Sequence, residues 1–165
     1  MDALHSQILH QFQLVGEPLF CDRYGFGHIN ETYLVVTDAA VRYILQKIND
    51  HVFPHVDQLQ HNIASVTEYL RKQTDERYGV LTLIPTLDGA TYYHSEEAGY
   101  WRVYDFIEGS ICLQAPEILE DFYQSAIAFG TFQQQLKDFP AETLCEVIPN
   151  FHNTVDRRFY FFISV

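Results

Sequence analysis

The middle of the chain contains the run Tyr100-Trp101-Arg102-Val103-Tyr104-Asp105-Phe106-Ile107-Glu108-Gly109. Its first part is rich in aromatic and β-branched residues, which are typical of strands, and it stops at a Glu-Gly pair. The pattern therefore predicts a strand that runs into a connector. Backbone donors and acceptors of such a connector are not used by a sheet, so they can pair with a flat heterocycle.

The composition limits the class of protein. The chain has 165 residues, of which 47% are hydrophobic and 15% aromatic, enough for one ordinary domain or two small lobes with a real core. This hydrophobic content excludes disordered and fibrous classes. The formal charge of −12 argues against binding to nucleic acid or to an anionic membrane. We therefore expect neither of these two partners.

The cysteines and the N-terminus indicate the compartment. Cys21, Cys112 and Cys145 lie far apart and form no CxxC pair, which indicates reduced thiols rather than a disulfide or zinc framework. The N-terminus is polar and unlike a signal peptide, and no apolar run approaches membrane-spanning length. We expect a soluble cytoplasmic protein.

The residues before the central run predict a short helix within 3–15 and three strands at 19–24, 29–36 and 41–48. Gly25-Phe26-Gly27-His28 forms the turn between the first two strands. Its glycines allow either an ordinary hairpin or a turn that closely approaches a phosphate. The second alternative needs a lysine on the strand that follows this hairpin. Lys47 is on that strand, at 41–48, and the chain has only two other lysines, Lys72 and Lys137.

Residues 55–72 predict an amphipathic helix, because apolar residues recur on one stripe: Leu59, Ile63, Val66 and Leu70. A polar group of this helix could hold Lys47, and Asn62 and Glu68 are the two candidates. At about 100° per residue, Glu68 points roughly 165° from the centre of the stripe and Asn62 only roughly 75°. We therefore favour Asn62 over Glu68 as the partner of Lys47.

The start of this helix also matches a catalytic spacing, H-x-D-x-x-x-x-N, with His55, Asp57 and Asn62. That motif works from a loop in a helical lobe, whereas these residues open a helix directly after the third strand. We interpret the match as coincidental. A metal cluster of His51, His55, Asp57 and His61 is disfavoured too, because Pro54 interrupts the helical spacing.

Strands at 80–86, at 91–94 and from Tyr100 complete the predicted sheet, with residues 87–90 as a hairpin turn. A second helix follows at 116–137, with Pro116 in its first turn. The predicted fold class is therefore α+β, a five-stranded antiparallel sheet carrying one helix and followed by the first part of a helical lobe. We place the sheet lobe at residues 1–107 and the connector exit with an incomplete helical lobe at 108–165.

Six motifs occur in a fixed order, at residues 25–33, 44–49, 66–70, 104–109, 128–132 and 151–154. Together they resemble the aminoglycoside phosphotransferase superfamily, and most closely its N-acetylhexosamine 1-kinase branch. The likeness runs from about residue 15 to 158. It implies a protein-kinase-like fold whose N-lobe is the sheet. It also implies transfer of the γ-phosphoryl group of ATP, with Mg²⁺, to the anomeric hydroxyl of an N-acetylhexosamine (GlcNAc or GalNAc).

The resemblance also implies roles for individual residues. Asp105 would offer its backbone carbonyl and Ile107 its backbone N–H to adenine, with Tyr104 at the gatekeeper position. Lys47 would bind the α- and β-phosphates, with Asn62 as the expected helix residue beside it. The turn that would cover the phosphates contains Gly25, Phe26, Gly27, His28 and Asn30.

The chain also departs from this family. Members are much longer and place the catalytic loop and a magnesium-binding Asp after the long helix. The aspartates after Gly109 are Asp121, Asp138 and Asp156, and each has a helical or polar context. Phosphoryl transfer depends on positioning and on metal-assisted charge stabilisation. We therefore expect no catalytic and no metal-binding residues in this chain, and no turnover by it alone, as for a truncated gene product.

Two alternatives remain open, namely the same fold acting on choline, homoserine or an aminoglycoside, and a non-enzymatic interaction module. The helix at 116–137 also predicts association. Later helices of a complete lobe would cover its apolar face, which consists of Ile118, Phe122, Ala126, Phe129 and Leu136. Residues 159–163 are apolar as well. We expect a homo-oligomer that forms through this helix and this tail.

Overall fold

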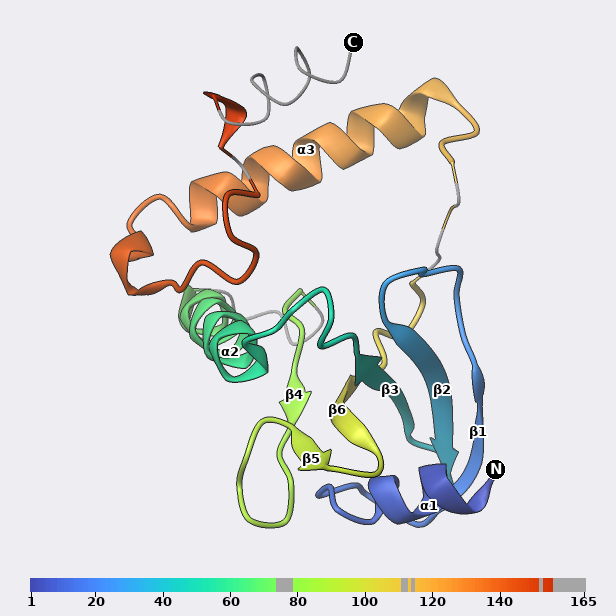
Figure 1. Cartoon of the computed structure of the whole chain (residues 1–165). Coiled ribbons are helices and arrows are strands. Elements are labelled where there is room, and N and C mark those ends of the chain that lie inside the picture. Colours follow the sequence, from blue (N-terminus) through green and yellow to red (C-terminus); the bar gives the residue numbers. More distant parts are fainter. Residues whose placement is uncertain (74–78, 111–112, 114, 152, 156–165) are drawn as a thin grey trace, which may run out of the picture.

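The computed structural model describes residues 1–73, 79–110, 113, 115–151 and 153–155 (Figure 1). Within them lie the helices α1 (Ala3–Leu9), α2 (Val56–Gln73) and α3 (Leu119–Gln135), and a 3₁₀ turn at Ala141–Thr143. The strands are β1 (Pro18–Arg23), β2 (Glu31–Thr37), β3 (Arg42–Ile48), β4 (Leu83–Ile84), β5 (Tyr93–Ser95) and β6 (Gly99–Asp105). The predicted α+β class is confirmed. No helix of the described ranges combines the length and the hydrophobicity that a bilayer crossing requires.

The sheet is antiparallel, with the strand order β1-β2-β3-β6-β4 and with β5 also paired to β6. β4 pairs with residues 103–104 and β5 with residues 99–101, so these two short strands lie end to end along one edge of β6. The sheet is thus five strands wide and, within the described residues, has six strands. These correspond to the six strand ranges that the sequence predicts, so the stated total of five was one too few. Only two residues of the predicted strand at 80–86 form strand pairs.

The turn predicted at residues 87–90 is confirmed. The Thr86 N–H donates to the Ala90 carbonyl (2.8 Å), and the Gly89 N–H donates to the Thr86 carbonyl (2.9 Å). Gly89 has a φ of +85°, which suits glycine because it has no side chain to clash. The two strands beside this turn each pair with β6, instead of forming the hairpin that the sequence predicts.

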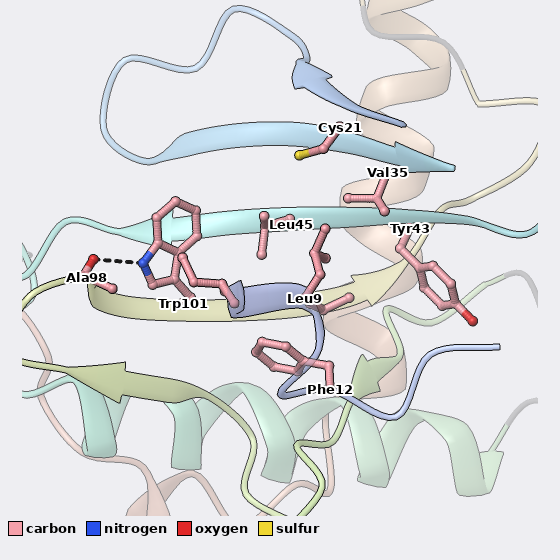
Figure 2. Packing of buried hydrophobic residues seen from close by; sticks show 10 residues of the cluster. Leu9, Phe12, Cys21, Val35, Tyr43, Leu45, Ala98 and Trp101 are labelled. Atoms are coloured by element: carbon pink, nitrogen blue, oxygen red, sulfur yellow. Dashed lines mark hydrogen bonds between the residues drawn. The ribbon is translucent and has the colours of Figure 1, made fainter. Parts of the chain in front are cut away.

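Side chains of the central strands alternate between the two faces of the sheet. The face beneath α1 carries the hydrophobic core that Figure 2 shows. Its strand residues include Val35 of β2, Leu45 of β3 and Val103 of β6, none of which has exposed surface. The N-terminal segment adds Ile8, Leu9 and Phe12. We call this side the α1 face and the opposite side the α2 face.

Trp101 is the largest fully buried side chain and joins three elements on the α1 face. Its Nε1 donates to the carbonyl of Ala98 (2.7 Å), so the polar atom of the indole is satisfied (Figure 2). The rings of His5 in α1 and Tyr33 in β2 lie against it, with centroids 5.6 and 6.1 Å away.

The first helix is shorter than the predicted range of 3–15. Asp2 caps its start by accepting a hydrogen bond from the His5 N–H (2.8 Å), and the helix ends at Leu9. Phe12 then forms an isolated bridge with Thr86, and its side chain is only 4% exposed. The chain leaves the helix so that Phe12 can enter the core beside the end of β4, which helical periodicity alone does not reveal.

α2 agrees with the predicted helix at 55–72 and contacts the α2 face of the sheet. Gln60, 1% exposed, is its most buried residue. The Gln60 Oε1 accepts a hydrogen bond from Arg102 of β6 (3.2 Å), and its Nε2 donates to the Thr91 carbonyl (3.1 Å). A polar side chain therefore links this helix directly to the sheet.

α3 lies apart from the sheet and contains no buried residue (Figure 1). The segment after it returns to α2, where Asn62 exchanges two hydrogen bonds with the backbone of Cys145 (2.8 and 2.9 Å). The rings of Tyr69 in α2 and Phe139 also meet, at 5.1 Å between centroids. The predicted tail at 159–163 lies outside the described residues.

Trp101→Ala should lower the free energy of unfolding by about 3–5 kcal/mol, because it removes a large buried side chain and leaves a cavity. Urea denaturation followed by circular dichroism measures this change. Leu87→Ala is the control, since Leu87 is 68% exposed. That control should shift the free energy by less than about 0.5 kcal/mol. Equal effects of the two substitutions would contradict the assignment of Trp101 to the core.

We propose that two or more copies of the chain associate through α3, so that each copy covers the apolar face of this helix in its neighbour. Phe122 and Phe129 are 59% and 69% exposed, and burying each would contribute about 1.5–3 kcal/mol. Light scattering at low micromolar concentration should give the mass of a dimer or larger species. Phe129→Asp should return the monomer mass, whereas Leu87→Asp, at a site of similar exposure, should not. A monomeric unmodified chain would rule out the association.

Candidate functional site

The connector after β6 presents backbone groups at the edge of the sheet. The N–H groups of Asp105 and Phe106 are used, because they donate to the carbonyls of Thr82 (3.0 Å) and Arg42 (3.3 Å). Among the described residues, nothing accepts a hydrogen bond from the Ile107 N–H. A pocket of about 330 Å³ lies here, and its lining includes residues 105–108, 40–42, Val80 and Thr82. The connector therefore offers a donor beside an open volume.

Arg42 of β3 fixes the path of this connector. Its guanidinium forms an ion pair with Glu108, in which Nε donates to Oε1 at 2.9 Å. The same guanidinium lies 4.4 Å from the ring centroid of Phe106, a favourable cation–π distance. The ring of Tyr24, the residue directly after β1, lies edge to face against that of Phe106, with the ring centroids 5.8 Å apart. One arginine thus links the connector to the strand next to β6.

The predicted glycine turn lies between β1 and β2, as expected. Gly25 has a φ of +75°, and a Cβ added there would meet no atom within 4 Å. Phe26, Gly27 and His28 are exposed. Asn30 anchors the end of the turn, because its Oδ1 accepts a hydrogen bond from the Asn49 N–H (2.9 Å). The turn is open to a ligand at its tip and attached to the end of β3 at its base.

Lys47 lies on the α1 face, not on the face that α2 contacts. It is two residues from the buried Leu45 and directly opposite Trp101, and its Nζ is 5.8 Å from the centroid of the Trp101 ring. Residues directly opposite in antiparallel strands point to the same face. The predicted pairing of Lys47 with a polar residue of α2 is therefore wrong, because the sheet lies between them.

The two helix residues considered for that pairing have other partners. Asn62 is engaged with the backbone of Cys145, and Glu68 forms an ion pair with Lys72 one turn later (2.9 Å). Asn62 thus positions the segment after α3. The predicted position of His55 and Asp57 around the start of a helix is confirmed, since α2 begins at Val56.

Arg102 occupies the α2 face, and the sequence reasoning missed it. Its Nε and Nη2 donate to Gln46 Oε1 (3.0 and 2.6 Å), and its Nη1 donates to Gln60 Oε1 (3.2 Å). Burial lowers the pKa of Arg102. Burial also raises the pKa of Tyr104, which shares this face two residues further along β6. The alternation of side chains along the strand could have revealed this position. If Trp101 and Val103 face the core, Arg102 between them must point to the opposite face of the sheet.

No group of three or more His, Cys, Asp or Glu side chains converges into a metal site within the described ranges. The histidines named above as a disfavoured cluster, together with Asp57, therefore form no such group there. The charged residues that line the connector pocket are Arg42, Asp105 and Glu108. A free backbone donor beside this pocket suits a ligand with a flat ring.

No known protein-family model matches this chain. A crystal structure of the aminoglycoside phosphotransferase from Alicyclobacillus acidocaldarius subsp. acidocaldarius DSM 446 is similar in fold, with a TM-score of 0.59 and 12% sequence identity. The match covers 86% of this chain but only 37% of that chain. At this identity the likeness shows the fold alone. The antiparallel sheet with its helices thus corresponds to a kinase-like N-lobe, as the sequence motifs imply.

Proposed function

We propose that this chain is the nucleotide-binding part of an ATP-dependent small-molecule phosphotransferase. The observation that carries the proposal is the Ile107 amide, which has no acceptor among the described residues and lies beside the connector pocket. Ile107 is 40% exposed, so water can accept this hydrogen bond in the free chain, and a flat ligand that enters the pocket can replace that water. The edge of adenine offers an acceptor of the required kind.

In this proposal adenine lies against the connector. Asp105 contributes its carbonyl and Ile107 its N–H, and Tyr104 closes the inner end of the ring site. The turn with Gly25, Phe26, Gly27, His28 and Asn30 covers the phosphates. Fold likeness to an aminoglycoside phosphotransferase supports the reaction class, phosphoryl transfer from a nucleotide to a small hydroxyl-bearing acceptor.

We propose N-acetylhexosamine as the acceptor, phosphorylated at its anomeric hydroxyl. The ordered motifs from residue 25 to 154 support this choice over other acceptors of the superfamily. Mg²⁺ accompanies ATP in such reactions, but the described residues offer no converging carboxylate group for it. A magnesium site is therefore not assigned to this part of the chain.

Purified 165-residue protein should form no N-acetylhexosamine 1-phosphate from ATP and the sugar. No H-x-D-x-x-x-x-N spacing follows Gly109, so the residues that orient the acceptor hydroxyl and hold the metal are missing. Product analysis by mass spectrometry with excess Mg²⁺ measures the reaction. Sugar phosphate above the level of a protein-free control would contradict this expectation, and Asp57→Asn would then test the spacing at the start of α2.

Adenosine should bind weakly through the connector, in the millimolar range, which corresponds to about −4 kcal/mol. Ile107→Pro removes the amide hydrogen and should weaken adenosine binding about tenfold, the value of one hydrogen bond at a desolvated site. Ile107→Ala keeps that hydrogen and should bind adenosine as the unmodified chain does. Ligand-observed NMR titration measures all three. Equal affinities for the Pro and Ala variants would exclude the Ile107 amide from the site.

A further inference from the structure

Arg102 is a part-buried cation whose described partners are all neutral. Gln46 and Gln60 accept its three hydrogen bonds through their amide oxygens. Within the described residues, no carboxylate lies within ion-pair distance of it. A guanidinium has five N–H donors, so two remain without an acceptor there. A cation that is taken out of water without a counter-charge is unfavourable, and this favours an anionic ligand.

The two glutamines are themselves held in place, so the guanidinium is pre-organised. The Gln46 Nε2 donates to the Thr32 hydroxyl (2.9 Å), and the Gln60 Nε2 donates to the Thr91 carbonyl (3.1 Å). Each amide therefore turns its oxygen toward Arg102 and leaves the positive charge unneutralised. Arg102 retains some exposed surface, which allows a ligand to reach it.

The glycine turn and Arg102 meet at a single atom. The Asn30 Nδ2, at the base of the turn, lies 3.5 Å from Gln46 Oε1, the oxygen that accepts two of the Arg102 hydrogen bonds. Arg102 is also three residues before Asp105 on β6, a separation of about 10 Å along an extended strand. The cation thus lies between the turn and the connector, the two parts of the proposed nucleotide site.

We propose that Arg102, held by Gln46 and Gln60, binds the polyphosphate of the nucleotide, the role that the sequence reasoning gave to Lys47. This inference rests on the proposed function for the identity of the ligand. Guanidinium groups suit phosphate oxygens because their planar donors can pair with two oxygens at once. Lys47 has no comparable position, because it lies on the opposite face of the sheet beside Trp101.

The test compares three probes on three proteins: ATP, adenosine and inorganic tripolyphosphate, titrated into the unmodified chain, Arg102→Met and Lys47→Met. The unmodified chain should bind ATP about tenfold more tightly than adenosine, since charge-assisted hydrogen bonds add to the contacts with adenine. Arg102→Met should abolish that difference and the binding of tripolyphosphate, whereas Lys47→Met should preserve both. Arg102→Lys should retain part of the difference, and circular dichroism of each variant checks its fold.

The outcomes separate the two proposals. If adenosine fails to bind but tripolyphosphate binds in an Arg102-dependent way, the anion site stands and the adenine site is wrong. If adenosine binds but Arg102→Met and Arg102→Lys leave the preference for ATP unchanged, Arg102 is not the phosphate ligand. Loss of that preference in Lys47→Met alone would return the role to Lys47. If neither tripolyphosphate nor ATP binds the unmodified chain, the inference is overturned.

Discussion

The burial of Trp101 and Val103 beneath α1 is the constraint on which the rest of the structure depends. Side chains of a strand point to alternate faces, so these two residues force Arg102 and Tyr104 onto the α2 face. The same strand pairs with β3, β4 and β5 and then leads into the connector. The core, the cation and the backbone donor of the candidate site are therefore placed by one strand, and a shift of its register by one residue would exchange the two faces.

This arrangement has an energetic consequence. The α1 face gains stability from well-packed hydrophobic groups, whereas the α2 face holds a guanidinium between amide oxygens. The amide oxygens accept the hydrogen bonds of Arg102 but do not neutralise its charge. An arginine at this position therefore contributes little to the stability of the fold. Burial lowers the pKa of Arg102, which reflects the same imbalance. Perturbed pKa values occur often at functional sites, which agrees with the proposal that Arg102 binds an anionic ligand.

Much of the fold could be predicted because its signals are local. The apolar stripe of α2, the turn before Ala90 and the strand that ends at Asp105 all follow from short-range periodicity and turn chemistry. Strands at 80–86 and 91–94 were predicted, but their pairing with β6 was not. β4 and β5 are so short that a local pattern does not show which strand each one pairs with. The predicted pairing of Lys47 with α2 was wrong for a different reason. Side chains alternate between the two faces along a strand, so the buried Leu45 and Trp101 place Lys47 on the α1 face, away from α2.

The two halves of the described chain are stabilised by different kinds of contact. The hydrophobic core lies within residues 8–103, while α3 contributes no buried residue and the segment after it is attached to α2 through Asn62 and Tyr69. The connector belongs to the first half, because Arg42 and the β6 ladder fix it independently of α3. Whatever covers α3 can therefore change without moving the Ile107 amide or Arg102. The proposed nucleotide site and the apolar surface of α3 are therefore separable, because no described core residue is shared between them.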